Sequence, residues 1–257
     1  MRPPPATRPP ANLLWFDEVD STNRTAARLL TAWADEDDPG RLADTVVVAG
    51  RQSAGRGRGA NSWVSPRGGL YASWVGWLPI SALDAVPLAA AVSLAGAVEG
   101  LVPGLKVGLK WPNDLHAGDG KLGGILCQSR VAGDGAWVIV GVGVNIDTAP
   151  ELGRDGGARA SCLAGLGWAG ECGDACGRLV AEFVGALRPA LADPAGTLAA
   201  WARRSVHVDG ELMLVRVGDE TARGRFAGFG PRGELRLELD GAVRTIAAGA
   251  LVAALEP

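Results

Sequence analysis

The residues best suited to chemistry stand between Gly50 and Trp63, in the stretch G-R-Q-S-A-G-R-G-R-G-A-N-S-W. Arg56 and Arg58 alternate there with glycines, so the backbone can approach a ligand closely and adopt positive φ angles. Two guanidinium groups on such a loop match the oxygens of a carboxylate or a phosphate. The stretch has little apolar surface to bury, so we expect it to be mobile until an anion binds, although a solvated surface turn can have the same composition.

Four further segments contain residues that could serve the same chemistry. Ser21–Asn23 reads S-T-N, which alone is typical of a helix start. Lys110–Asp114 reads K-W-P-N-D, a turn with a cation and a carboxylate, and Lys121–Leu126 reads K-L-G-G-I-L. Gly141–Asn145 reads G-V-G-V-N and places one polar side chain in an apolar run. Each segment alone is compatible with a purely structural role.

The hydrophobic pattern predicts the elements that position these segments. Strands are expected over 12–16, 45–50, 70–77, 107–110, 121–129 and 137–146, with a hairpin turn at 132–135. Helices are expected over 22–33, capped by Ser21, and over 83–101, 171–191 and 194–203, with an acidic turn at 35–40. The β-branched run T-V-V-V-A-G ends directly before the Arg/Gly stretch, so a buried strand leads into it.

The composition changes after about Arg204. Leu235, Leu237 and Leu239 alternate with charged residues, which is the pattern of a half-buried strand. Several such short strands near the end of the chain predict a small β-barrel. The expected fold is α+β, with a disordered Pro-rich tail over 1–11, a mixed-sheet domain over 12–204 and a small all-β domain over 205–257.

The overall composition excludes several classes of protein. The chain has 257 residues, 47% of them hydrophobic, and a net charge of -3, which argues against a general nucleic-acid binder and makes any anion site local. The Pro-rich tail excludes an apolar signal core and leaves no room for a DNA-binding module before Asn12. Glycine, proline and charges interrupt every apolar run, so no membrane span is expected.

The four cysteines are predicted to be free thiols, as in a reducing cytoplasm. Cys172 and Cys176 share a helix face, but no second pair with metal-binding spacing accompanies them. Structural zinc is therefore not expected.

In their order and spacing, S-T-N, the Arg/Gly stretch, K-W-P-N-D with K-L-G-G-I-L, and G-V-G-V-N closely resemble the biotin–protein ligases. The resemblance extends from about Leu13 to the end of the chain. It implies a mixed-sheet catalytic domain of the biotin/lipoate ligase type followed by an SH3-like β-barrel. Members activate biotin with ATP to biotinyl-5′-AMP and transfer it to one lysine of a biotin carboxyl carrier protein, such as that of acetyl-CoA carboxylase. Some members also repress transcription through an N-terminal DNA-binding domain, so this chain resembles the monofunctional kind.

The resemblance also implies roles for individual residues. Lys121, Arg58 and Asp114 would be catalytic, with Lys121 the main electrostatic catalyst. Biotin would contact Ser21, Thr22, Asn23, Gln52, Gly55, Arg56, Arg58, Lys121, Gly123 and Gly124. The nucleotide would contact Arg56, Arg58, Trp63, Lys110, Asn113, Lys121 and Asn145. Mg²⁺ would arrive on the ATP phosphates, and Asp114 would orient either that hydrated ion or the acceptor lysine.

One position departs from the common bacterial pattern. Asn61 stands where many bacterial relatives have a further arginine, so a triphosphate contact at that position would lack its charge. Other members have asparagine there.

Two other functions remain as alternatives. A lipoate–protein ligase or octanoyltransferase shares the architecture but has no G-R-G-R loop, and lipoate has no ureido group to engage Ser21, Thr22 and Gln52. A biotin-binding regulator without catalysis would not need Lys121 and the arginine pair. The resemblance leaves a cytoplasmic monomer and a cytoplasmic homodimer equally open.

Overall fold

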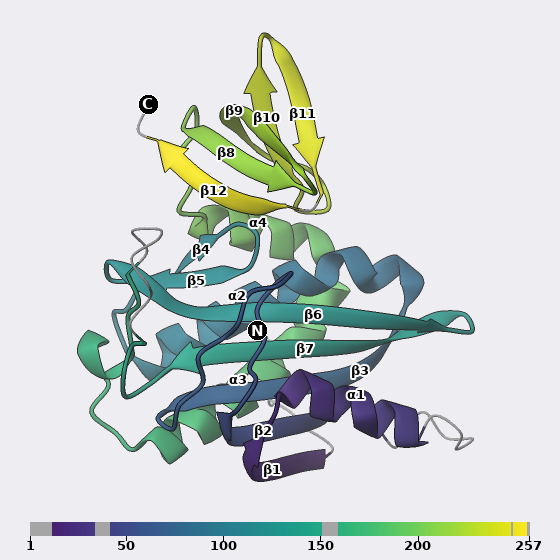
Figure 1. The fold of residues 1–257 in the computed structure, drawn as a ribbon, viewed down its shortest axis with the longest axis vertical. Coiled ribbons are helices and arrows are strands. Elements are labelled where there is room, and N and C mark those ends of the chain that lie inside the picture. Colours follow the sequence, from purple (N-terminus) through teal and green to yellow (C-terminus); the bar gives the residue numbers. More distant parts are fainter. Residues whose placement is uncertain (1–11, 34–41, 151–158, 248, 256–257) are drawn as a thin grey trace, which may run out of the picture.

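A seven-stranded mixed sheet lies at the centre of the molecule, in the strand order β1-β2-β3-β7-β6-β5-β4 (Figure 1). The computed structural model describes residues 12–33, 42–150, 159–247 and 249–255, so the tail at 1–11 and the acidic turn at 35–40 lie outside the described residues. β1 runs parallel to β2, and every other neighbouring pair is antiparallel. The strands are β1 (Asn12–Val19), β2 (Thr45–Gln52), β3 (Gly69–Pro79), β4 (Gly108–Lys110), β5 (Asp114–Ala117), β6 (Gly120–Ala132) and β7 (Gly135–Asn145).

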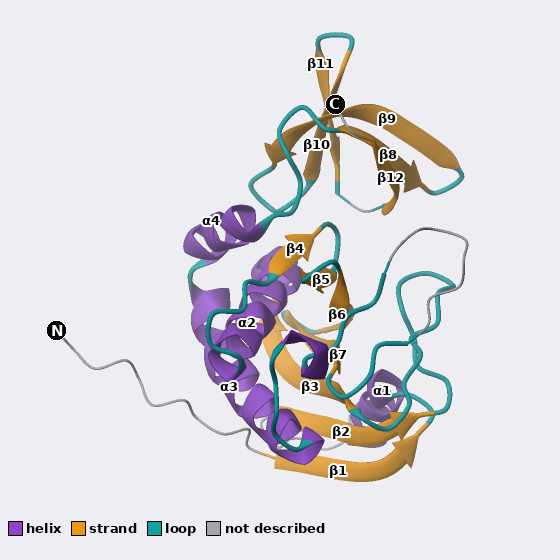
Figure 2. Cartoon of the chain, turned by 90° about the vertical axis from the view of Figure 1, so that its left-hand side faces the viewer, coloured by secondary structure: helices purple, strands orange, loops and turns teal. Residues whose placement is uncertain are grey.

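Helices cover both faces of this sheet (Figure 2). On one face lie α2 (Val86–Leu101) and α3 (Cys172–Ala192), with α4 (Pro194–Arg204) beside them, and on the other lies α1 (Thr22–Trp33). Alternate residues of β7 divide between the two sides: Val138 and Val140 enter the core under α2 and α3, whereas Trp137 and Ile139 enter the core under α1. The predicted run of apolar residues thus arises because β7 is buried on both faces.

α1 is fixed to the sheet by the side chain of Asn23, which lies over Gly141 of β7. Asn23 Nδ2 donates to Gln128 Oε1 at 2.9 Å and to the Leu126 carbonyl at 3.2 Å, both on β6. Asn23 Oδ1 lies 2.6 Å from Ser73 Oγ on β3. The S-T-N segment, which alone is typical of a helix start, is therefore also the point where the helix is joined to three strands.

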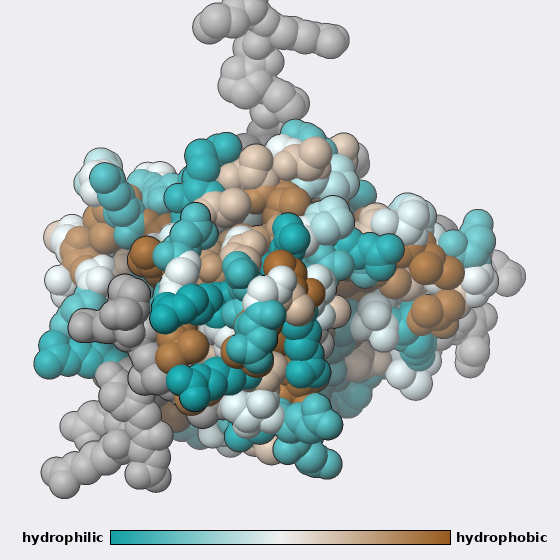
Figure 3. Space-filling view, turned by 90° about the horizontal axis from the view of Figure 1, so that it is seen from above, coloured by the Kyte–Doolittle hydropathy of each residue, from teal (hydrophilic) through white to brown (hydrophobic). Residues whose placement is uncertain are grey.

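The end of the chain forms a separate antiparallel sheet, which we call the C-terminal sheet, in the order β11-β10-β9-β8-β12. It lies above the seven-stranded sheet at the end near β4 and β5 (Figure 1). Seen from above, its hydrophilic and hydrophobic side chains are intermingled (Figure 3). The strands are β8 (Leu212–Val217), β9 (Glu220–Phe229), β10 (Leu235–Leu239), β11 (Ala242–Ile246) and β12 (Ala250–Leu255). The prediction of a small all-β unit after a mixed sheet is confirmed.

Most predicted elements are found within a few residues of their expected bounds, and the differences have local causes. Pro87 lies in the first turn of α2, so the expected helix over 83–101 begins at Val86, after a 3-10 segment at Ile80–Ala85. The W-P-N-D turn leads into the short strand β5, which the sequence pattern did not predict. All four cysteines are free thiols, and the Sγ atoms of Cys172 and Cys176 are 4.0 Å apart.

The expectation that no apolar run reaches the length of a membrane span is wrong. The helical stretch Ile80–Leu101 is long and apolar enough by length and composition, with a mean hydropathy of 1.7, and half of it is buried inside the protein. Glycine in this stretch does not break the helix: Gly96 and Gly100 are both helical and lie on its exposed side. α2 is apolar because it packs against α3 and the sheet.

Gly141 and Asn23 are expected to be coupled in stability. A Cβ atom at Gly141 would collide with Asn23 Oδ1, so Gly141→Ala must push the buried amide out of its hydrogen bonds. We expect Gly141→Ala and Asn23→Ala each to lower the free energy of unfolding by about 1–3 kcal/mol. In the double variant the added methyl group enters the space left by the amide, so the two losses are expected to be clearly less than additive. Urea unfolding of the four proteins measures the coupling.

Gly96→Ala is the matched control for this pair, because a Cβ there meets nothing within 4 Å on the exposed face of α2. Its effect should be neutral or stabilising, by up to about 1 kcal/mol. Strict additivity of Gly141→Ala and Asn23→Ala would contradict the packing described.

Candidate active site

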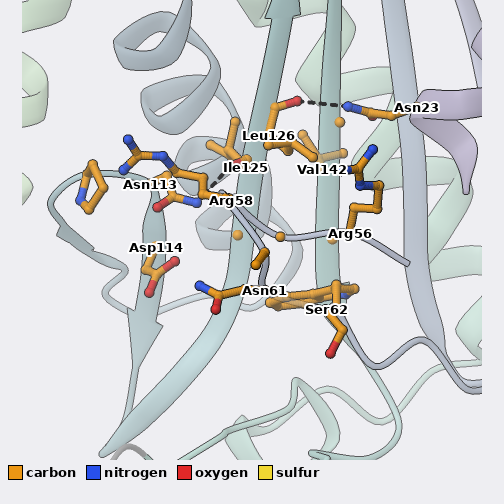
Figure 4. A pocket seen from close by; sticks show the side chains of 18 of the residues that line it. Asn23, Arg56, Arg58, Asn61, Ser62, Asn113, Asp114, Ile125, Leu126 and Val142 are labelled. Carbon is orange, nitrogen blue, oxygen red and sulfur yellow. Dashed lines mark hydrogen bonds between the residues drawn. The ribbon is translucent and has the colours of Figure 1, made fainter. Parts of the chain in front are cut away.

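The sequence segments singled out for their chemistry line one cavity of about 490 Å³ on the α1 side of the sheet (Figure 4). Its walls are the start of α1, the loop between β2 and β3, and the W-P-N-D turn. We call residues 53–68 the Arg/Gly loop. β6 and β7 form the floor, and Arg216, Gly218, Gly249 and Leu251 of the C-terminal part close it from above. The cavity therefore lies where the two sheets meet.

The floor of the cavity is bare of side chains where Trp63 lies against it. Gly143 of β7 pairs with Gly124 of β6, and both face the α1 side. A Cβ atom at Gly143 would lie 2.7 Å from Trp63 Nε1, and one at Gly124 would lie 3.4 Å from the same ring. Since Trp63 Nε1 is buried without a hydrogen-bond partner, the indole rests there through packing and not through a polar bond.

The Arg/Gly loop folds back on itself as a small hairpin. Trp63 N–H donates to the Gly55 carbonyl at 3.0 Å, Gly57 N–H donates to the Asn61 carbonyl at 2.8 Å, and Arg56 and Ser62 form a bridge. A Cβ atom at Gly55 would strike the Trp63 carbonyl and Ser65 Oγ. Gly55 is thus required by the fold of the loop itself.

At the α1 end of the cavity, four oxygens form a continuous row. Asn23 Oδ1, Ser73 Oγ, Thr22 Oγ1 and Gln52 Oε1 are separated in turn by 2.6, 2.8 and 3.2 Å. The two amide oxygens can only accept hydrogen bonds. The orientation of each amide is set by its nitrogen: Asn23 Nδ2 donates to Gln128 Oε1, and Gln52 Nε2 donates to Ser65 Oγ at 2.8 Å.

Two hydroxyl protons serve these three oxygen–oxygen contacts, and Thr22 N–H donates to Gln52 Oε1 at 2.8 Å, so both amide oxygens already have a donor. Ser73 is fully buried, whereas Thr22 and Gln52 line the cavity. A ligand N–H in the cavity would find acceptor lone pairs on Thr22 Oγ1 and Gln52 Oε1. This end of the cavity is built to accept a hydrogen bond from a ligand.

The opposite end of the cavity is cationic. Lys121 Nζ lies 2.6 Å from Asp114 Oδ1 and 5.3 Å from the centroid of the Trp63 ring. Arg56 and Arg58 do not converge: their side chains point in opposite directions from the loop (Figure 4). Arg58 Nη1 donates to the Gly249 carbonyl at 2.9 Å, and burial lowers the pKa of its guanidinium. Arg58 thus joins the Arg/Gly loop to the C-terminal part, and the expected double clamp on one anion is not formed in this structure.

Most residues predicted for the site lie in the wall of this cavity. Those that line it are Ser21, Thr22, Asn23, Gln52, Arg56, Arg58, Trp63, Asn113, Asp114, Lys121 and Gly124. The side-chain amides of Asn23 and Asn113 already make hydrogen bonds within the protein. Asn23 Nδ2 donates to β6, and Asn113 Nδ2 donates to the Ile125 carbonyl at 2.8 Å. The position of Asn61 is also in the wall.

Four predicted residues lie outside the wall. Gly123 pairs with Val144, whose side chain enters the core under α2 and α3, so Gly123 faces away from the cavity. Asn145 is buried, and its Nδ2 donates to the Ser161 carbonyl at 3.0 Å. Gly55 shapes the loop, and Lys110 lies on β4 at the start of the W-P-N-D turn.

The sequence pattern missed the contribution of the C-terminal sheet. Arg216 of β8 is exposed, with buried Met213 and Val215 alternating on the other side of the strand. That alternation predicts an outward side chain at Arg216 but not that it reaches the cavity. No local signal places a strand near the end of the chain over residues from its first half.

Comparisons with known proteins agree with this arrangement. Residues 15–145 match the model of the biotin/lipoate A/B protein ligase family. The biotin–[acetyl-CoA-carboxylase] ligase of Paracoccus denitrificans is 34% identical over 233 residues, which are 85% of this chain and 91% of that protein. The fold is similar to that of biotin protein ligase from Aquifex aeolicus in complex with biotin and ATP, with a TM-score of 0.71 and 23% identity over 96% of this chain and 100% of that one.

A second similar structure is the biotin protein ligase of Leishmania major in complex with biotinyl-5-AMP, with a TM-score of 0.59 and 22% identity over 93% of this chain and 100% of that one. The family match covers half of the chain, and the Paracoccus relative is matched over nearly its whole length. This chain belongs to the biotin/lipoate A/B protein ligase family.

Proposed function

We propose that this chain is an ATP-dependent biotin–protein ligase. It activates biotin to biotinyl-5′-AMP and then transfers biotin to a lysine of a biotin carboxyl carrier domain. The observation that supports this most is one cavity that combines a row of acceptor oxygens at one end with a cationic group, Lys121, at the other. The relative from Paracoccus denitrificans, which bears the corresponding name, agrees with it.

The α1 end of the cavity suits the ureido ring of biotin. A ureido N–H directed at Thr22 Oγ1 or Gln52 Oε1 gains a hydrogen bond from this row of oxygens, and a ligand without that N–H gains none there. Lipoate has no such group, so the row favours biotin. Ser21, in the same wall, is placed to meet the ureido oxygen.

The cationic end suits the reacting groups. A carboxylate oxygen of biotin bonds to the α-phosphorus while the bond from that phosphorus to the bridging oxygen of the β-phosphate breaks, and pyrophosphate leaves. The two anions repel each other until fixed cations offset their charge, which is the role of Lys121, Arg56 and Arg58. Arg58 must leave the Gly249 carbonyl to reach the phosphate.

The nucleotide occupies the region between Trp63 and the W-P-N-D turn. Trp63 leaves its place on Gly143 and covers the adenine, and Asn113 contacts the nucleotide from the turn. Lys110 and Asn145 lie outside the cavity wall and act indirectly, by supporting the backbone around the nucleotide. Mg²⁺ enters with ATP as part of the substrate: within the part of the chain that the structure describes, no three His, Cys, Asp or Glu side chains form a group that could hold a metal.

Transfer requires the acceptor lysine to reach the acyl carbon. Its amine nitrogen bonds to that carbon, AMP leaves, and the amine loses one proton. Asp114, next to Lys121, orients the incoming amine. The carrier domain and MgATP are both found in the cytoplasm, so the protein acts there, as a monomer or a homodimer and without a DNA target.

Incubation with MgATP, labelled biotin and a biotin carboxyl carrier domain tests the function. Label should appear on one carrier lysine, and a carrier with that lysine changed to arginine is the matched control. Replacing biotin with lipoate or octanoate distinguishes a biotin ligase from a lipoate–protein ligase or an octanoyltransferase. Transfer of lipoate but not biotin, or binding of biotin without transfer, would overturn the proposal.

Lys121→Met should nearly abolish adenylate formation. The substitution keeps an apolar side chain of similar length beside Trp63 but removes the charge that stabilises the transition state. Biotin-dependent exchange of labelled pyrophosphate into ATP is expected to fall by about 10²–10³-fold. Near-normal exchange would remove Lys121 from the first step.

Arg58→Gly should release the intermediate more than it slows its formation. Loss of one charge-assisted hydrogen bond to the adenylate is expected to raise its dissociation rate by roughly 10–100-fold. Dissociation is followed by chasing labelled biotinyl-5′-AMP from the enzyme with unlabelled adenylate. An unchanged dissociation rate would show that Arg58 stays on Gly249 during catalysis.

Arg216→Ala should weaken the binding of ATP and pyrophosphate without changing transfer. Arg216 lines the cavity from above and can partly replace the charge that Asn61 lacks. The KM for pyrophosphate in the exchange reaction is expected to rise roughly three- to tenfold, because the side chain is exposed to solvent. Arg223→Ala, on the neighbouring strand β9, is the control. A rise in KM only for the carrier would assign Arg216 to the partner instead.

A further inference from the structure

His207 connects the two sheets at a point that the catalytic scheme does not use. It lies between the end of α4 at Arg204 and the start of β8 at Leu212. The preceding residues extend the edge of the catalytic sheet, because Ser205 bridges Leu109 of β4 and Val206 N–H donates to the Leu109 carbonyl at 3.0 Å. The His207 side chain is 1% exposed and packs beside Phe226 of β9, with 5.5 Å between the ring centroids.

The imidazole accepts a hydrogen bond from the backbone of the W-P-N-D turn. Trp111 N–H donates to His207 Nε2 at 3.1 Å, a buried contact between positions 96 residues apart. Nδ1 of the same ring lies 3.5 Å from Glu211 Oε2. An Nε2 that accepts must be unprotonated, so the ring is neutral with its proton on Nδ1, facing the carboxylate.

The residue that His207 holds begins the turn that enters the active site. Pro112, Asn113 and Asp114 follow Trp111 directly and line the cavity. The far side of the turn is held by β6, where Ile125 N–H donates to the Asn113 carbonyl at 3.0 Å. The near side depends on His207, because its ring fixes the first backbone amide of the turn.

We propose that His207 is a positioning residue for the reaction. By accepting a hydrogen bond from Trp111 N–H, it fixes the turn that leads to Asp114, whose Oδ1 lies 2.6 Å from Lys121 Nζ. Because His207 directly precedes the C-terminal sheet, it also links the position of this turn to the position of that sheet. This rests on the proposed function of the same cavity.

The surroundings of His207 make this contact sensitive to acid. The charged and titratable groups facing it are Glu211 before β8, Lys110 on β4 and His116 on β5. Burial is the main cause that lowers the pKa of His207 below its usual value, so the acceptor nitrogen is free at neutral pH. Protonation would turn Nε2 from an acceptor into a donor facing another donor. Because the folded-state pKa is lowered, the contact is complete above the ordinary histidine value of about 6.5 and is lost as the pH falls toward the lowered one.

Two substitutions separate positioning from general stability. His207→Gln places an amide oxygen near the position of Nε2 and cannot titrate, whereas His207→Leu fills the space without an acceptor. At pH 7.5, we expect His207→Leu to lose about tenfold or more in the kcat of pyrophosphate exchange per folded molecule, and His207→Gln to restore most of it. Circular dichroism and thermal unfolding measure the folded fraction.

The pH profile gives the decisive readout. Wild-type kcat should fall reversibly as the pH drops below the ordinary histidine value of about 6.5 toward the lowered pKa of His207, and His207→Gln should remove that acid limb. His116→Gln is the matched control, because burial lowers the pKa of His116 to about 4 and it is the other histidine in the chain. It should leave both the activity at pH 7.5 and the acid limb in place.

Some outcomes would overturn the proposal. Normal kcat per folded molecule in His207→Leu would show a purely structural histidine, and an unchanged acid limb in His207→Gln would remove its titration from the reaction. Absence of biotin-dependent exchange in the wild-type protein would instead refute the proposed function, so the two failures are distinguishable.

Discussion

The active site depends on the absence of side chains along one face of β7. On the α1 side of this strand, Trp137 and Ile139 are followed by Gly141 and Gly143, so the packed core under α1 ends and an open floor begins. Gly141 allows Asn23 to reach β6, which fixes the start of α1, and Gly143 allows Trp63 to reach the sheet. A methyl group at either position would collide with the residue above it. The two walls of the cavity are thus placed by the same strand.

The polar groups around this floor are arranged so that each end of the cavity has a different electrostatic character. The oxygen row from Asn23 to Gln52 presents hydrogen-bond acceptors, while Lys121 and the arginines supply positive charge at the other end. Both ends involve residues far apart in the chain, and two contacts join them to the C-terminal part: Arg58 with Gly249, and Trp111 with His207. The C-terminal part therefore helps to close the cavity and is connected to the residues that line it.

Local patterns were sufficient to predict most of the strands and helices, though not the short strand β5, because β-branched runs and helical periodicity depend on neighbouring residues. They also identified most of the cavity wall, since the motifs stand at strand ends and turns. Their limits are equally physical. Asn145 was expected at the nucleotide, but its amide is used to hold the Ser161 carbonyl. The direction of the Arg58 side chain depends on the Gly249 carbonyl, 191 residues away in the chain. The contribution of Arg216 depends on how the C-terminal sheet lies over the cavity. A local sequence pattern contains neither kind of information.

A crystal structure with biotinyl-5′-AMP bound tests the central claim most directly. The account predicts the ureido ring against Thr22 and Gln52, the phosphate beside Lys121, Trp63 moved from Gly143 onto the adenine, and Arg58 released from Gly249. An adenylate bound elsewhere, or one seated in the cavity with Trp63 still on Gly143 and Arg58 still on Gly249, would contradict it.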